Sequence, residues 1–300
     1  MALGNLAQRF LVAVVAVPIL LLILHYERPE PTWAVIFIAS ILAMQEFFAM
    51  TLPKEDRRPA LVIGAIACAA FFWLDPVLYA RTYSPENETV VKLFGFAMTA
   101  QATVALIFGV VVPGLWYLFK FRDIPSVAGR YAATVAGIVY AGFLTTYLAK
   151  LKLIDPHRVG DTVVIVLLVA WVADTGGYFA GRFLGKAKLY EAVSPKKTWA
   201  GAYGGLAGSV LGVAVLKLAV ADWLTWVDVF AIAIPGGILG QMGDLAESLI
   251  KRSVGVKDSG ALLPGHGGIL DRIDAVLFIA PYVYTYLSFK FAFVTVVPMH

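Results

Sequence analysis

The sequence predicts an all-α, polytopic integral membrane protein with about nine transmembrane helices. The chain of 300 residues is 60% hydrophobic and only 15% charged, and its apolar residues fall in long continuous runs. A helix needs roughly 20 mostly apolar residues to cross about 30 Å of hydrocarbon. Only helices and closed barrels satisfy every backbone amide in a bilayer, and barrel strands would alternate apolar and polar residues, which these runs do not.

Charged or Pro- and Gly-rich breaks separate the apolar runs and define the expected spans. The first run follows Arg9 as in a secretory signal, but no small-residue cleavage site comes after it, so we expect an uncleaved span. Asp75-Pro76 interrupts the third and weakest run. The expected spans are 8–25, 33–50, 60–80, 93–119, 129–149, 161–181, 200–220, 227–249 and 274–296. We expect an N-terminal transmembrane region of about five helices (1–160) and a C-terminal catalytic region (161–300).

The basic residues indicate the orientation. If the N-terminus and every second connection share one side of the membrane, that side holds 16 of the 24 Lys and Arg residues. The positive-inside rule then makes that side cytoplasmic, although Lys150, Lys152 and Arg158 fall on the other. The net charge of +4 is modest and lies largely at membrane boundaries, so nucleic acid is not an expected partner. Because Cys68 is the only cysteine, no intrachain disulfide or cysteine metal site can form.

Two carboxylates lie inside predicted spans, where an unpaired charge costs at least about 2.5 kcal/mol. Glu46, in the second span, either pairs with a buried base or lines a polar cavity. Asp174, in the sixth, either forms a structural salt bridge or belongs to a polar site between helices. Both residues therefore need partners that the fold must supply.

The segment 194–198 predicts a helix start, because Ser194 suits an N-cap and Pro195 suits the first helical position. This placement puts Lys196 and Lys197 at the mouth of the seventh span, where free amides and the helix dipole attract phosphate. The alternative is that the two lysines only anchor a helix at the headgroups. Glycines at three- and four-residue spacing follow, at 201, 204, 205, 208 and 212, and predict close helix packing.

The segment 243–274 carries the densest chemistry. On a helix Asp244, Glu247, Ser248 and Lys251 share one face. A glycine-rich loop follows, and the chain returns to a helix at about Leu270. We expect acids at both ends of this loop, Asp244 and Asp271, to face each other. Their oxygens suit Mg²⁺, and the basic residues around them suit a polyphosphate.

These residues resemble the phosphatidate cytidylyltransferase (CDP-diacylglycerol synthase) family, whose signature reads approximately Ser-x-x-Lys-Arg, then Lys-Asp, then His-Gly-Gly-x-x-Asp-Arg-x-Asp. The chain supplies, in register, Ser248, Lys251, Arg252, Lys257, Asp258, His266, Gly267, Gly268, Asp271, Arg272 and Asp274. Asp174 and the segment 194–199 also match, so the resemblance covers about residues 170–280. Ala200 departs from the Glu or Gln that the family often has there.

The resemblance implies a phospholipid-biosynthetic enzyme of the inner (cytoplasmic) membrane, with its active site facing the cytoplasm. It would join CTP and phosphatidate into CDP-diacylglycerol and pyrophosphate with Mg²⁺; a second cation and a homodimer are left open. We assign Asp244 and Asp271 to the metal, with Asp174 and Asp274 in support. His266 and Lys257 are the further catalytic candidates, and the role of His266 is open between orienting the triphosphate and proton transfer. The substrate-binding candidates are Ser194, Lys196, Lys197, Thr198, Lys251, Arg252, Gly267, Gly268 and Arg272.

Two other functions have similar requirements. A CTP-dependent polyprenol or lipid kinase also needs membrane helices, a metal and a basic loop, but it would move the γ-phosphate. A transporter also carries intramembrane acids. The charges here gather at one membrane face and no two halves of the chain repeat each other, which favours the transferase.

Overall fold

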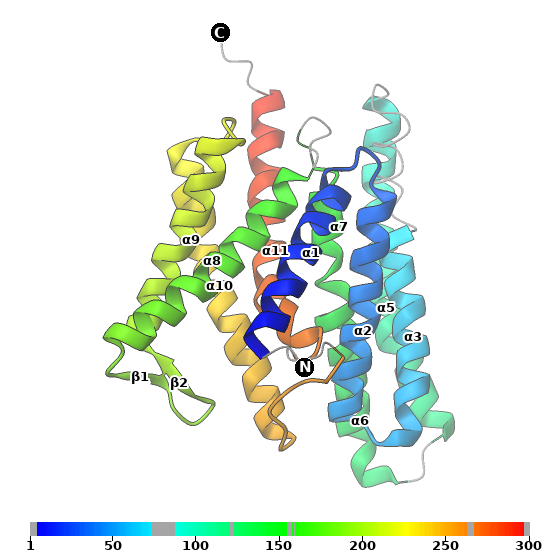
Figure 1. Cartoon of the computed structure of the whole chain (residues 1–300). Helices are drawn as coiled ribbons and strands as arrows, with labels where there is room; N and C mark the ends of the chain where they lie inside the picture. The colour runs from blue at the N-terminus through cyan, green and yellow to red at the C-terminus, as the bar shows by residue number, and fades with distance from the viewer. Residues whose placement is uncertain are drawn as a thin grey trace. The chain divides into compact units, whose positions relative to one another are not determined.

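A computed structural model describes residues 5–73, 88–120, 123–154, 158, 160–262 and 267–296, and helices dominate it (Figure 1). The first helices are α1 (Asn5–His25), α2 (Glu30–Thr51), α3 (Lys54–Trp73) and α5 (Glu88–Lys120). Three consecutive helical pieces follow: α6 (Ile124–Gly137), the π-helix η1 (Ile138–Phe143) and α7 (Thr146–Leu151). The remaining elements are α8 (Asp161–Leu184), β1 (Lys188–Tyr190), β2 (Ser194–Thr198), α9 (Trp199–Ala219), α10 (Trp226–Ser253) and α11 (Leu270–Val296).

Every predicted span overlaps a helix in the part of the chain that the structure describes. Six helical stretches there are long and apolar enough to cross a membrane: 30–51, 103–120, 124–151, 161–184, 199–219 and 226–253. The third predicted span is helical up to Trp73, whereas its interruption at Asp75-Pro76 lies outside the described residues. The predicted membrane-protein class is therefore supported by helix length and composition.

The chain divides into two compact units. The first contains Met1–Ile19, Tyr26–Leu153 and Asp258–Leu270; the second contains Leu20–His25, Ile154–Lys257 and Asp271–His300. Residues 258–270 thus belong to the first unit, although the predicted division places them within the region 161–300. The predicted functional division at residue 160 stays a prediction.

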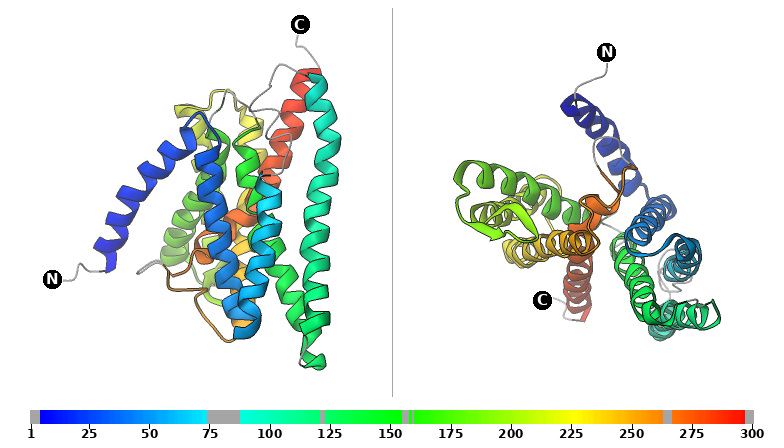
Figure 2. Two further views of the ribbon diagram at one scale, coloured as in Figure 1. Left: turned by 90° about the vertical axis from the view of Figure 1, so that its right-hand side faces the viewer. Right: turned by 90° about the horizontal axis from the view of Figure 1, so that it is seen from below.

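The first unit has an apolar core between α2, α3, α5 and the α6–η1 segment, and Figure 2 shows α2 and α3 side by side. Phe48, Met44 and Ile138 are at most 1% exposed in this core. A Cβ at Gly137 would come closer than 3.0 Å to the rings of Phe47 and Phe48, so α6 packs directly on those rings. This packing holds the C-terminal half of α2 in place, where Glu46 lies.

In the second unit, glycines let α8 and α9 pack backbone to backbone. A Cβ at Gly176 would come closer than 3.0 Å to Gly204 O, and one at Gly208 would come equally close to Val172 O. The prediction that the glycines of the seventh span serve close packing is confirmed. This contact holds Asp174, which lies on α8 between the contacting residues.

Helices α10 and α11 are joined by a buried polar cluster and by further glycines. Asp228 closes a capping box with Thr225 at the start of α10 and also accepts hydrogen bonds from Tyr286 Oη (2.7 Å) and Lys290 Nζ. Nearer the other end of α10, a Cβ at Gly243 would lie 2.6 Å from Asp274 O. The acidic part of α10 therefore lies close to the first turns of α11.

A short hairpin precedes α9, and here the predicted helix start at Ser194 is wrong. Residues 194–198 form strand β2, which pairs antiparallel with β1 in the register Lys188↔Thr198 and Tyr190↔Ser194. The cap is Thr198, whose Oγ1 accepts a hydrogen bond from Gly201 N at 3.1 Å. Pairing with β1 keeps Ser194 and Pro195 extended, so the helix begins only at Trp199.

Candidate active site

The second unit carries four polar side chains on one face of α10, near its C-terminal end. Ser248 Oγ donates to Asp244 Oδ1 at 3.4 Å, and Lys251 Nζ donates to Glu247 Oε2 at 2.6 Å. Both pairs are four residues apart, as neighbours on a helix surface are. The prediction that these residues share a face is confirmed.

Lys251 also joins α10 to α11. Its Nζ lies 2.7 Å from Asp271 Oδ1, so one ammonium group bridges Glu247 and Asp271. Glu247 is 1% exposed, and the side chains of Lys251 and Asp271 are 11% and 10% exposed. Removal of Lys251 would leave both carboxylates without a counter-charge, so this lysine links the two helices.

The hairpin supplies a second base to the same helix. Lys197 Nζ lies 2.6 Å from Asp244 Oδ2, with side-chain exposures of 26% and 36%. Strand β2 therefore places a lysine on one of the predicted metal-binding carboxylates. The Asp244 side chain is partly exposed and open to a ligand from solvent, whereas the Lys197 ammonium is buried.

Two further acids approach this cluster from α8 and α11. Asp174 lies close enough to Asp244, Lys197 and Arg272 for their charges to interact, and Asp274 is similarly coupled to Asp244, Glu247 and Asp174. Asp274 Oδ1 also accepts a hydrogen bond from Ala275 N at 2.8 Å. Carboxylates from three helices thus converge, and their mutual repulsion favours a bound cation.

The donor chemistry of this cluster fits Mg²⁺, which prefers carboxylate oxygens. Glu247 Oε1 is buried and has no hydrogen-bond partner in the described structure, so one carboxylate oxygen is left for another ligand. No three acidic, histidine or cysteine side chains among the described residues are already arranged around one ion. Asp244 and Asp271 are each paired with a lysine here, and their assignment to a metal stays a prediction.

The remaining predicted phosphate-binding bases differ in their contacts and their exposure. Arg252 joins the end of α10 to the hairpin, since its Nε donates to Val193 O at 3.5 Å and its Nη1 to Val256 O at 3.2 Å. Lys196, Lys257 and Arg272 are exposed. Figure 1 places the hairpin and the C-terminal end of α10 at the same end of this unit. Exposed cations at that end can meet an incoming anion.

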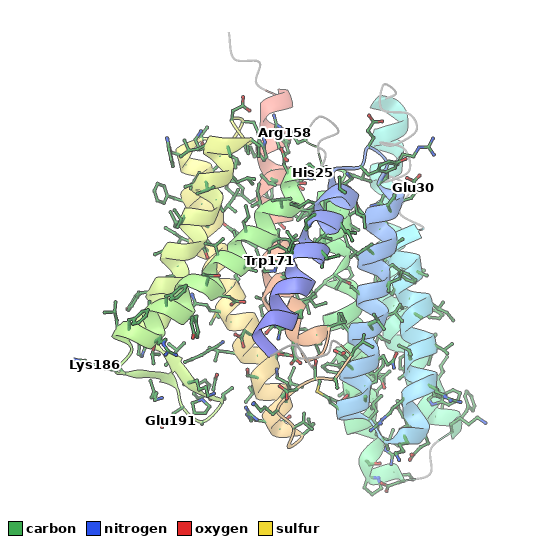
Figure 3. The ribbon with its side chains drawn as sticks, in the orientation of Figure 1. His25, Glu30, Arg158, Trp171, Lys186 and Glu191 are labelled. Carbon is green, nitrogen blue, oxygen red and sulfur yellow. The ribbon has the colours of Figure 1, made fainter. Side chains whose placement is uncertain are left out.

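The hairpin and Arg158 lie at opposite ends of the second unit. Figure 3 shows Lys186 and Glu191 at the hairpin, Trp171 midway along α8 and Arg158 at the opposite end. There the Arg158 guanidinium stacks on Trp223, 4.3 Å from the ring centroid, which gives it a structural role.

The predicted substrate-binding residues outside this cluster differ in what they can do. The Thr198 hydroxyl accepts the hydrogen bond that caps α9, and Ser194 lies in β2. Gly267 has φ +79°, a conformation that favours glycine, and Gly268 is buried. His266 lies outside the described residues, so its role stays open.

Among the residues that the structure describes, Glu46 in the first unit binds hydrogen-bond donors of the loop before α11 and no base. Its carboxylate is 8% exposed and accepts hydrogen bonds from Ser259 Oγ (3.0 Å), Ile269 N (3.0 Å) and Leu270 N (2.9 Å). It therefore caps the start of α11, where free amides and the helix dipole stabilise an anion. Sequence reasoning identified a buried acid here but could not find its partners, because backbone amides leave no signature.

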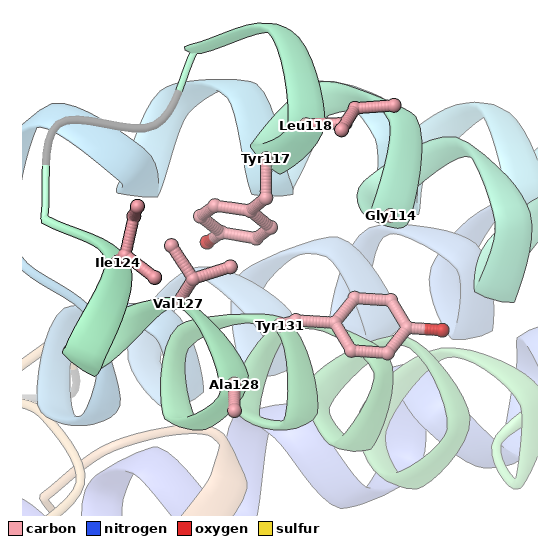
Figure 4. Close-up of a pocket in the computed structure, with 7 residues that line it drawn as sticks. All are labelled: Gly114, Tyr117, Leu118, Ile124, Val127, Ala128 and Tyr131. Atoms are coloured by element: carbon pink, nitrogen blue, oxygen red, sulfur yellow. The ribbon is translucent and has the colours of Figure 1, made fainter.

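A cavity of about 520 Å³ beside α5 and α6 offers little chemistry (Figure 4). Its polar groups are two tyrosine hydroxyls: Tyr117 Oη bonds Thr134 Oγ1 at 3.0 Å, and Tyr131 Oη donates to Val110 O at 3.2 Å. The cavity lining is Gly114, Tyr117, Leu118, Ile124, Val127, Ala128 and Tyr131. The charged cluster in the second unit stays the candidate active site, and its assignment is a prediction.

Comparison with known proteins identifies the family of this chain. Residues 7–290 match the model of the cytidylyltransferase family. The chain belongs to this family. The match includes the first 160 residues, where the sequence resembles the family only in hydropathy, so the family match covers residues of both units.

Individual relatives carry the name phosphatidate cytidylyltransferase. One from Bacillus subtilis is 31% identical over 284 residues, which are 95% of this chain and 98% of that protein. One from Brucella suis is 46% identical over 154 residues, half of this chain and 55% of the relative. The match thus spans about half the length of the Brucella proteins. One from Synechocystis is 36% identical over 197 residues.

Proposed function

We propose that this protein transfers the cytidylyl group of CTP to phosphatidate, giving CDP-diacylglycerol and pyrophosphate in phospholipid biosynthesis. The observation that carries the proposal is the convergence of Asp174, Asp244, Asp271 and Asp274 with a set of lysines and arginines in a chain of the cytidylyltransferase family. A triphosphate with its cation needs both kinds of charge.

The reaction needs no protein nucleophile. An oxygen of the lipid phosphate forms a bond to the α-phosphorus of CTP, and the bond from that phosphorus to the β-phosphate oxygen breaks. A phosphate monoester has its second pKa at about 6, so the attacking oxygen is already anionic at neutral pH. The protein therefore contributes position and charge neutralisation.

The chain's bases divide this work. The exposed Lys196, Lys257 and Arg272 would meet the phosphates first. Lys197 and Lys251, now bound to Asp244 and Asp271, lie within reach of the same site. Negative charge grows on the leaving pyrophosphate, so cations directed at it would lower the barrier. The roles of Gly267 and Gly268 stay predictions from the family resemblance.

Asp244 and Asp271, supported by Asp174 and Asp274, would hold Mg²⁺. When bound, it would neutralise phosphate charge and polarise the oxygen of the leaving group. A second cation stays open, as does the role of His266.

The proposal extends to the membrane setting of the protein. We propose about nine spans, including those that the six long apolar stretches do not cover, in the cytoplasmic membrane of a bacterium. The charged end of the second unit would face the cytoplasm, where CTP is found. A homodimer stays a prediction.

The proposal is tested on detergent-purified protein supplied with phosphatidate, CTP and Mg²⁺. We expect one pyrophosphate per CDP-diacylglycerol formed, and no pyrophosphate without phosphatidate. Release of inorganic phosphate without CDP-diacylglycerol would reject the assignment.

A further inference from the structure

The carboxylate of Glu46 binds both ends of one loop. Ser259 Oγ lies 3.0 Å and Leu270 N 2.9 Å from the same oxygen, Oε2, while Ile269 N lies 3.0 Å from Oε1. Ser259 and Leu270 are eleven positions apart in the sequence. A single buried side chain on α2 therefore holds the two ends of the loop together. Its hydrogen bonds offset the entropy that a flexible chain loses when its ends are brought together.

Two glycines of this loop fit the carboxylate closely. A Cβ at Gly260 would lie 2.6 Å from Glu46 Oε1, and one at Gly268 would come closer than 3.0 Å to both Glu46 and Ser259 Oγ. A side chain at either position would displace the carboxylate or the loop. The glycines thus leave the space that Glu46 occupies.

The bound segment lies between residues of the proposed active site. Lys257 comes two positions before Ser259, and Asp271 and Arg272 come directly after Leu270. Because Glu46 takes the amides of Ile269 and Leu270, it fixes where α11 begins. The backbone that carries Asp271 and Arg272 is then continuous with a segment fixed at three hydrogen bonds.

We propose that Glu46 is a positioning residue for cytidylyl transfer: it holds Ser259, Ile269 and Leu270, and so fixes the backbone next to Lys257, Asp271 and Arg272 in the chain. This inference rests on the proposed function. Glu46 itself contacts no reacting atom; it acts through the loop.

The decisive variant is Glu46→Gln, which keeps the size of the side chain but sets an NH₂ group against amide donors. Hydrogen bonds to a charged acceptor are the stronger ones, so we expect amide exchange in the peptide 259–270 to rise by about tenfold to a hundredfold. The kcat/KM for CTP should fall by a similar factor, while the melting temperature of the whole chain stays near the parent value. Glu55→Gln is the matched control, because the Glu55 side chain is 57% exposed and its carboxylate lies 3.5 Å from Arg130 Nη1.

Two further variants keep the test decisive if Glu46→Gln does not fold. Ser259→Ala removes one neutral donor and should raise exchange in the same peptide about threefold. Gly268→Ala should be as damaging as Glu46→Gln, and the double variant should be no worse than either single one, since both act on one contact.

Unchanged exchange in 259–270 in the folded variants would overturn the inference, as would activity that falls only in proportion to the folded fraction. Failure of the proposed function looks different: the parent protein would then make no CDP-diacylglycerol, while the exchange measurements would still report on the loop.

Discussion

At the scale of single residues, the two acids assigned first to the metal each lie beside a lysine. Asp244 is paired with Lys197 and Asp271 with Lys251, at 2.6 and 2.7 Å. The lysine ammonium neutralises the carboxylate before substrate arrives. Once substrate is bound, the same ammonium can form an ion pair with a phosphate. Removal of such an acid therefore tests two roles, stabilisation of charge during the reaction and a structural ion pair with the lysine.

Asp271→Asn separates these two roles. Lys251 keeps Glu247 as a partner at 2.6 Å, and Asn suits a helix N-terminus, so we expect expression and thermal stability to change little. Turnover should fall by about a hundredfold or more if Asp271 stabilises charge during the reaction.

If Asp271 only neutralises Lys251, stability should instead fall by roughly 3–5 kcal/mol, and activity should follow the folded fraction. Asp222→Asn, in the exposed turn before α10, is the control and should leave both quantities unchanged. Near-normal turnover in a well-folded Asp271→Asn variant would remove Asp271 from the site.

At the scale of elements, helix packing sets where the acids meet. The acids come from α8, α10 and α11, and the glycine contact between α8 and α9 fixes the helix that carries Asp174. Gly208→Ala should therefore cost about 1–3 kcal/mol, since its Cβ would overlap Val172 O. Thermal unfolding in detergent measures this loss.

Gly129→Ala is the matched control for Gly208. A Cβ at Gly129 would meet no atom within 4 Å, although Gly129 also lies inside a helix. We expect it to unfold at or slightly above the parent temperature. Equal melting temperatures for the two variants would contradict the packing argument.

The convergence of carboxylates from three helices also predicts a requirement for a divalent ion. Excess chelator should abolish turnover and lower the melting temperature, because the acids then repel one another. Added Mg²⁺ should restore both. Full turnover in excess chelator would show that lysines alone neutralise the substrate.

The sequence predicted those features that depend on local pattern. Helices followed from apolar runs, the shared face of Asp244 and Lys251 from helical spacing, and the start of α11 from the end of the glycine-rich loop. The hairpin was missed because Ser194-Pro195 is compatible with both a helix start and an extended strand. The partners of Glu46 were missed because they are one hydroxyl and two backbone amides more than 200 positions away.

At the scale of the whole molecule, the charged end of the second unit should face the cytoplasm. In a Cys68→Ala background, a cysteine at Glu191 in the hairpin should resist an impermeant maleimide in intact spheroplasts. A cysteine at Asp222, beside Trp223 and Arg158 at the opposite end, should react. The reverse pattern would overturn the orientation.

The central claim is that the cytidylyl group, and not the terminal phosphate, moves to the lipid. Its most direct test gives the purified protein phosphatidate and Mg²⁺ with CTP labelled at either the α- or the γ-phosphorus, and counts label in the organic phase. We expect the α-label to enter the lipid and the γ-label to stay in water as pyrophosphate. A lipid that carries the γ-label while the α-label stays in water would contradict the account, because it would identify a lipid kinase.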